Sequence, residues 1–88
     1  MSTEESGPAV IRVHLFASYA ERLGQSVIEL PAEGLQTAGD VLDRVRALPR
    51  GGALGPSTLL AVNFRHSPPE APVRSGDEVA IMPPLAGG

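Results

Sequence analysis

The chain has 88 residues and a formal net charge of −3 at pH 7, which fits one domain with a modest core. The acidic charge gives no reason to expect nucleic-acid binding, and the lack of cysteine excludes disulfides and a cysteine nucleophile. With no basic segment before an apolar run, and with apolar runs too short to cross a bilayer, we expect a cytoplasmic protein without membrane contact.

The first third of the chain predicts two strands joined by a short helical connection. Residues 1–9 are mostly polar and are expected to form a disordered tail. Apolar and polar residues then alternate over 10–16, which is typical of a strand. Residues 17–23 predict a short helix that ends at Gly24, and residues 26–30 predict a second strand, antiparallel to the first.

The main helix has the clearest start signal in the sequence. Thr37-Ala38-Gly39-Asp40 resembles a capping box with aspartate in place of glutamate. The following apolar residues have the spacing of one buried helix face: Ala38, Val41, Leu42, Val45 and Leu48.

The second half of the chain predicts two further strands. Residues 59–64 form a nearly continuous apolar run, typical of a strand covered on both faces. Residues 66–75 are expected to be mostly loop, with a short edge strand near Val73, and residues 79–82 form the last strand. A right-handed crossover through the helix would place the first and last strands side by side at the centre. We therefore predict an α+β, β-grasp (ubiquitin-like) domain over 10–82.

Residues 83–88 predict an extended functional tail. Pro83 and Pro84 lack a backbone N–H, so the strand ladder must end there. Six residues reach up to roughly 20 Å when extended, and the pair Gly87-Gly88 makes the last part very thin. Such a tail suits insertion of the terminal carboxylate into a narrow channel. The alternative is an ordinary frayed terminus.

Catalytic and metal-binding patterns are absent from the sequence. The two histidines, His14 and His66, have no ligand spacing and are interpreted as surface or edge residues. Strand alternation directs the carboxylates of Asp77 and Glu78 to opposite faces, against paired acid–base work. We expect no metal site, no bound cofactor and no ATP site in this chain.

The ending Asp77-Glu78-Val79-Ala80-Ile81-Met82-Pro83-Pro84-Leu85-Ala86-Gly87-Gly88 resembles that of the ubiquitin-like sulfur carriers. It is most similar to the small subunit of molybdopterin synthase. Three other stretches fit that family in order: Leu15-Phe16-Ala17 with Glu21 and Gly24, Leu59-Leu60-Ala61-Val62-Asn63, and Pro72-Val73-Arg74-Ser75-Gly76-Asp77-Glu78. The resemblance covers about residues 10–88.

The resemblance implies a co-substrate more than an enzyme. An E1-like adenylyltransferase would use ATP to adenylate the Gly88 carboxylate, and a sulfur donor would convert it to a thiocarboxylate. A larger synthase subunit, or another sulfur-accepting enzyme, would then receive the sulfur for molybdopterin (molybdenum cofactor) biosynthesis. Gly87 would keep the channel entrance unhindered. Pro83, Pro84, Leu85 and Ala86 would direct the tail and line its contacts.

Exposed apolar side chains are expected to mark the partner's docking surface. By strand alternation, Phe16 and Met82 lie on the face of their strands that does not point to the core, and they could form one patch beside the tail. The alternative is that each packs under a loop. Ile81-Met82 departs from the aromatic residues frequent in molybdopterin synthase small subunits, which leaves the identity of the large subunit open.

Two other functions stay open at this point. The carrier could serve thiamine, cysteine or secondary-metabolite biosynthesis by the same chemistry. It could also be a ubiquitin-like protein modifier that forms an amide with lysines of target proteins. All seven permanently cationic residues are arginine, so the chain offers no lysine to another copy of itself.

Overall fold

The computed structural model describes residues 9–55 and 57–84. In chain order the elements are β1 (Val10–Leu15), α1 (Ser18–Leu23), β2 (Val27–Pro31), α2 (Ala38–Arg46), the short 3₁₀ helix η2 (Gly51–Ala53), β3 (Leu59–Val62), β4 (Arg65–His66) and β5 (Glu78–Met82). The strands β1 and β2 and the helices α1 and α2 lie within two residues of their predicted bounds.

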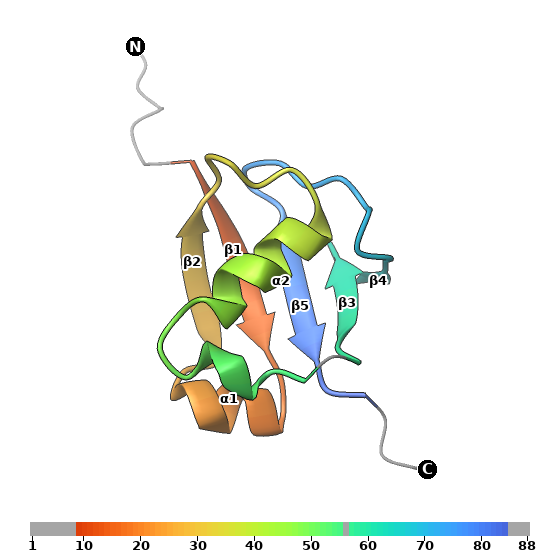
Figure 1. Cartoon of the computed structure of the whole chain (residues 1–88). Helices are drawn as coiled ribbons and strands as arrows, with labels where there is room; N and C mark the ends of the chain where they lie inside the picture. Colours follow the sequence, from red (N-terminus) through yellow and green to blue (C-terminus); the bar gives the residue numbers. More distant parts are fainter. Residues whose placement is uncertain (1–8, 56, 85–88) are drawn as a thin grey trace.

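The five strands form one mixed sheet in the order β2-β1-β5-β3-β4, with α2 across one face (Figure 1). The central pair β1 and β5 is parallel, with Val13 opposite Val79, and the other neighbours are antiparallel. This is the β-grasp (ubiquitin-like) fold. The prediction that the first and last strands lie side by side at the centre is confirmed.

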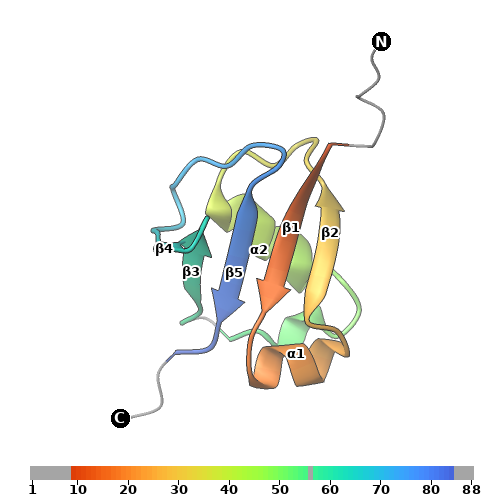
Figure 2. The ribbon, with the colours of Figure 1, turned by 180° about the vertical axis from the view of Figure 1, so that it is seen from behind.

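The hydrophobic core lies between the sheet and α2. Its largest fully buried side chains come from β1, β5 and α2: Ile11, Val13, Val41, Val45, Val79 and Ile81. Burying each of them contributes roughly 1.5–3 kcal/mol, as an upper bound. In the described part of the chain no helix crosses the opposite face of the sheet (Figure 2). We call this opposite face the open face.

The start of α2 is fixed by the predicted capping box. The Thr37 hydroxyl accepts a hydrogen bond from the Asp40 N–H at 3.1 Å, and the Asp40 carboxylate accepts one from the Thr37 N–H at 3.1 Å. The same carboxylate accepts a second hydrogen bond, from the Gln36 N–H at 3.0 Å. Together these bonds satisfy backbone donors that a helix N-terminus otherwise leaves free.

A loop from the second half of the chain satisfies two further donors at this helix end. The N–H groups of Ala38 and Gly39 donate to the carbonyls of Ala71 and Pro69, both at 2.8 Å. A Cβ on Gly39 would lie 3.2 Å from the Pro69 carbonyl oxygen. Gly39, which weakens helix propensity, therefore permits the close approach of the loop.

Three predictions for the second half of the chain are wrong in detail. Helix α2 ends at Arg46, so Leu48 is not part of its buried face but packs against the core from the following turn. Strand β3 ends at Val62, and its continuation Asn63-Phe64 is a turn into β4, with Phe64 81% exposed. No edge strand forms near Val73: its neighbour Pro72 makes only an isolated β-bridge with Thr37, and the buried Val73 donates its N–H to the Gln36 carbonyl.

The capping carboxylate predicts a pH dependence of stability. Hydrogen bonds from the N–H groups of Gln36 and Thr37 hold the pKa of Asp40 below its ordinary value of 3.8. The ionised form is thus favoured by folding, and its contribution to stability is present above the unfolded-state pKa and lost as pH falls through the lower folded-state value.

We expect Asp40→Asn to flatten the fall in the free energy of unfolding between about pH 5 and pH 2. Urea unfolding of the variant and the wild-type chain at several pH values in that range measures it. An unchanged pH profile in the variant would contradict the role of this carboxylate.

Candidate functional site

The predicted tail begins at the end of the central strand β5. Met82 is the last residue of β5 and is half-buried. Pro83 is also half-buried and Pro84 is exposed. The other predicted tail residues, Leu85, Ala86, Gly87 and Gly88, lie outside the described residues. The structure therefore places the start of the tail at one end of the central strand pair, β1 and β5.

Phe16 lies beside the same end of the sheet. Its N–H donates to the Ile81 carbonyl at 3.2 Å, which continues the β1–β5 pairing by one residue. Its side chain is 48% exposed. The next residue, Ala17, has φ 53° and ψ −131°, a conformation that L-residues rarely adopt, and it turns the chain into α1. The structure thus brings Phe16 and Met82, 66 positions apart in the sequence, to neighbouring strands.

Two residues that the sequence did not single out extend this surface. Leu59 is directly opposite Met82 in the antiparallel β3–β5 register, and Ala80 precedes Met82 by two positions on the same face. Both are half-buried. We call Phe16, Leu59, Ala80 and Met82 the apolar patch. Strand alternation identifies Ala80, but Leu59 joins the patch only once the pairing of β3 with β5 is known.

The other half of the open face is charged. Glu78 lies at the start of β5; its carboxylate is 2.8 Å from Nε2 of His14 and 4.0 Å from the Arg12 guanidinium. Arg12 also pairs with Glu29 of β2 at 3.4 Å. Since Arg12 is 50% exposed and Glu29 56% exposed, that pair contributes little to stability. Along β5 the open face thus changes from charged at Glu78 to apolar at Met82, where the tail begins.

The two histidines were interpreted as surface or edge residues. His14 lies on the central strand β1, where its side chain is 27% exposed and contacts Glu78. His66 does lie on the edge strand β4 and is exposed, as the sequence indicated.

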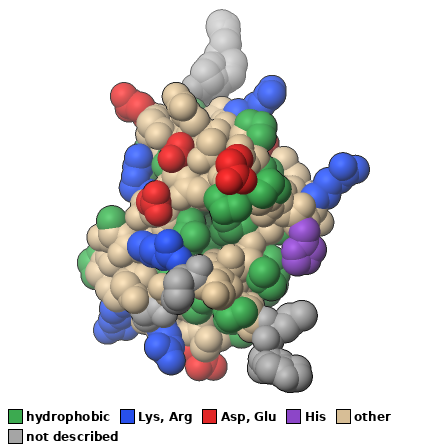
Figure 3. Space-filling view, turned by 45° about the vertical axis from the view of Figure 1, so that its right-hand side comes forward, with side chains coloured by type: hydrophobic (Ala, Val, Ile, Leu, Met, Phe, Trp, Pro, Cys, Tyr) green, Lys and Arg blue, Asp and Glu red, His purple; other side chains and the backbone are tan. Residues whose placement is uncertain are grey.

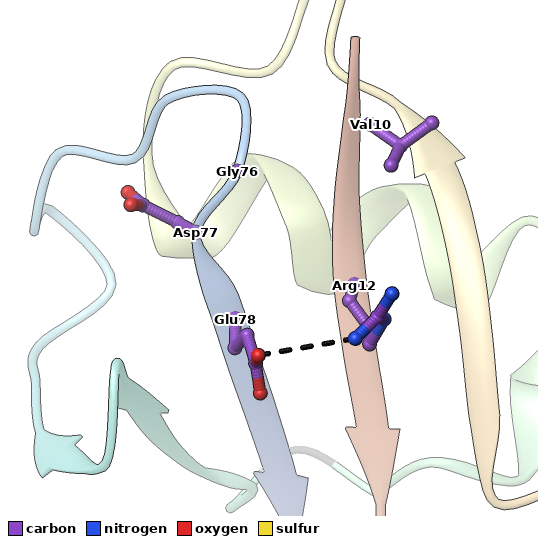
Figure 4. Close-up of a pocket in the computed structure, with 5 residues that line it drawn as sticks. All are labelled: Val10, Arg12, Gly76, Asp77 and Glu78. Atoms are coloured by element: carbon purple, nitrogen blue, oxygen red, sulfur yellow. Dashed lines mark ion pairs between the residues drawn. The ribbon is translucent and has the colours of Figure 1, made fainter. Parts of the chain in front are cut away.

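A small pocket lies at the far end of β5 from the tail (Figure 4). Its lining residues are Val10, Arg12, Gly76, Asp77 and Glu78, and the Arg12–Glu78 ion pair crosses it. Asp77 accepts a hydrogen bond from the Arg74 N–H at 2.9 Å and so serves the turn before β5. Because Asp77 and Glu78 already have partners within the protein, this pocket is not the candidate site.

The described residues offer little else for chemistry. They contain no cluster of three or more histidine, cysteine, aspartate or glutamate side chains that could hold a metal ion. None of the helices in the described ranges has the length and apolar character needed to span a bilayer. Seen from the β3–β4 side, hydrophobic side chains are exposed in the centre and lower right, between charged ones (Figure 3). The arrangement is suited to contact with another protein.

Comparison with known proteins agrees with this arrangement. A model of the ThiS family matches residues 13–88. The Haloferax volcanii HVO 2177 protein is 28% identical, with a TM-score of 0.75 over 100% of this chain and 94% of that chain. Small archaeal modifier protein 1 of H. volcanii is 25% identical, with a TM-score of 0.73 over 88% of this chain and 99% of that chain.

A third similar structure is a complex of subunits 1 and 2 of the molybdopterin-converting factor from Helicobacter pylori. The match has a TM-score of 0.63 at 14% identity, over 90% of this chain and 99% of that chain, and it shows the fold alone. The fold is that of a ubiquitin-like β-grasp protein, and the family match over residues 13–88 places it among proteins of the sulfur-carrier type. The chain belongs to the ThiS family.

Two neighbouring residues at the end of β1 test whether the patch contributes to the stability of the core. We expect Phe16→Ala to lower the free energy of unfolding by less than about 1 kcal/mol, because half of the side chain is exposed. The matched control Leu15→Ala removes a side chain that is 3% exposed and should cost about 2–5 kcal/mol. Urea unfolding measures both, and equal losses would show that Phe16 is a core residue.

Proposed function

We propose that the chain is a sulfur carrier whose Gly88 carboxylate is adenylated and then converted to a thiocarboxylate for molybdopterin biosynthesis. The observation that carries the proposal is the position of the tail. It begins at Pro83, directly after the last residue of a central strand and beside a partly exposed apolar patch. A partner that docks on the patch can receive the tail without unfolding any part of the sheet. The family match, which extends to residue 88, also supports it.

The chemistry needs nothing from side chains of this chain. An E1-like enzyme binds ATP. The Gly88 carboxylate attacks the α-phosphorus of this ATP, and pyrophosphate leaves. A sulfur nucleophile then attacks the acyl carbon, and AMP leaves with the electrons of the broken C–O bond. Gly88 carries the sulfur, and Gly87 offers no side chain to obstruct a narrow channel. The chain is thus a co-substrate, and this ATP-dependent reaction belongs in the cytoplasm.

The residues between β5 and the two terminal glycines would direct the carboxylate. Pro83 and Pro84 end the hydrogen-bonded ladder and favour an extended backbone. Leu85 and Ala86 would line the contacts inside the partner. Phe16 and Met82 would anchor the docking, and the adaptable methionine side chain suits contact with more than one partner.

The acceptor of the sulfur is proposed to be a larger synthase subunit. The similar H. pylori structure is a complex of subunits 1 and 2 of a molybdopterin-converting factor, which supports this assignment. Carriers for thiamine, cysteine or secondary metabolites would use the same tail chemistry, and their acceptors would differ.

A second function is favoured by one specific observation. A relative that is 25% identical is named a small archaeal modifier protein. In that function the activated Gly88 would form an amide with lysine amines of other proteins. The present chain has no lysine, so copies of it could not be linked through lysine side chains.

Changes at the last residue test the proposal. We expect deletion of Gly88, or addition of one alanine after it, to abolish ATP–pyrophosphate exchange by the adenylating enzyme, because the reactive carboxylate is displaced. The unfolding midpoint in urea should stay unchanged, since neither change touches the described domain. If either variant supports exchange at the wild-type rate, the terminal carboxylate is not the reactive group.

A further inference from the structure

Phe64 is the most exposed large hydrophobic residue in the described part of the chain. Its side chain is 81% exposed, against 48% for Phe16 and 43% for Val27. It occupies the two-residue turn that joins β3 to β4, at the edge of the sheet (Figure 1). A phenylalanine at this position contributes little to the core, and a single exposed apolar side chain is not by itself evidence of a contact.

The backbone of this turn is unfavourable for phenylalanine. Asn63 has φ 50° and Phe64 has φ 70°, as a tight hairpin turn with positive φ at both central residues requires. Glycine is favoured at the second of these positions, whereas a bulky side chain there is rare. Strained residues of this kind persist where the surrounding structure determines them, and they cluster at binding sites.

The turn is fastened firmly to the beginning of β5. The Asn63 N–H donates to the Glu78 carbonyl at 2.7 Å, and the Glu78 N–H donates to the Asn63 side-chain oxygen at 3.0 Å. The Asn63 side-chain amide also donates to the Asp77 carboxylate at 3.1 Å. The Phe64 backbone therefore has a rigid base, which lowers the entropy lost when the ring is held by a partner.

Phe64 and the start of the tail lie at opposite ends of the same strand. The turn is bonded to Glu78, the first residue of β5, and the tail follows Met82, the last residue. These two residues are about 13 Å apart along the strand. A protein that receives the tail and lies along this edge of the sheet can reach Phe64 at the same time.

The tail itself cannot identify its carrier by side chains at its end. Gly87 and Gly88 carry none, so contacts with the folded domain can supply the distinction between one carrier and another that these two residues do not. Exposed aromatic residues are frequent anchors of protein interfaces. The residues after Phe64, Arg65 and His66, are exposed and basic, which fits a partner surface with carboxylates around an apolar pocket.

We propose that Phe64 is a specificity-determining contact for the adenylating enzyme, inserted in an apolar pocket rimmed by acidic residues. The proposal rests on the function proposed above. It adds a second contact, distinct from the apolar patch, that governs affinity for the enzyme and leaves the chemistry at Gly88 unchanged.

The test compares four variants in binding to the adenylating enzyme and in ATP–pyrophosphate exchange. Phe64→Ala and Phe64→Gly both remove the ring, but only glycine relieves the positive φ. We expect both to weaken binding by at least about tenfold and to raise KM for the carrier to the same extent, with kcat within about twofold. Phe64→Tyr keeps the ring and should bind like the wild type, as should the control Val27→Ala, which alters an exposed apolar residue on the opposite edge strand.

Stability is measured on the same variants. The Tm of Phe64→Gly should be unchanged or higher by up to about 5 °C, because the strain at this position is removed. Weaker binding by a variant that is at least as stable as the wild type cannot be ascribed to unfolding. Wild-type affinity in both ring-deletion variants, or no binding by the wild-type chain, would overturn the proposal. Binding without any exchange by the wild type would instead contradict the proposed function.

Discussion

The parallel pairing of β1 with β5 is the interaction on which the rest of the structure depends. Parallel strands cannot be joined by a hairpin, so the chain must cross through α2 before it returns to the centre of the sheet. In this register Val13 lies opposite Val79 and Leu15 opposite Ile81, and all four are buried under the helix. Because the two strands run in the same direction, they end together, and the tail begins beside Phe16.

The two faces of the sheet have separate roles. Along β5, Val79 and Ile81 face the helix and hold the fold, while Glu78, Ala80 and Met82 lie on the open face. Substitutions on the open face can therefore change partner contacts with little loss of the core. Strand β5 ends at Met82, before the tail begins, so the chemistry proposed at Gly88 is separate in sequence from the residues that form the core. A carrier that must enter and leave several enzymes requires this separation.

Local sequence patterns predicted the parts of the fold that local interactions determine. The capping box at 37–40 and the alternating first strand were identified because their signals lie within a few residues. The turn at 63–64 was missed because it lacks the glycine that marks such turns. The pairing of His14 with Glu78, and the place of Leu59 in the patch, depend on the register between distant strands. That register is set by the packed core, which no short pattern encodes.

The most direct test of the proposed function is the intact mass of the chain, ending in a free Gly88, after incubation with ATP, a sulfide source and the adenylating enzyme. The proposed function predicts a mass gain equal to the replacement of one oxygen atom by sulfur, localised to Gly88. An unmodified mass, with the same enzyme shown to be active on its own known carrier, would contradict it.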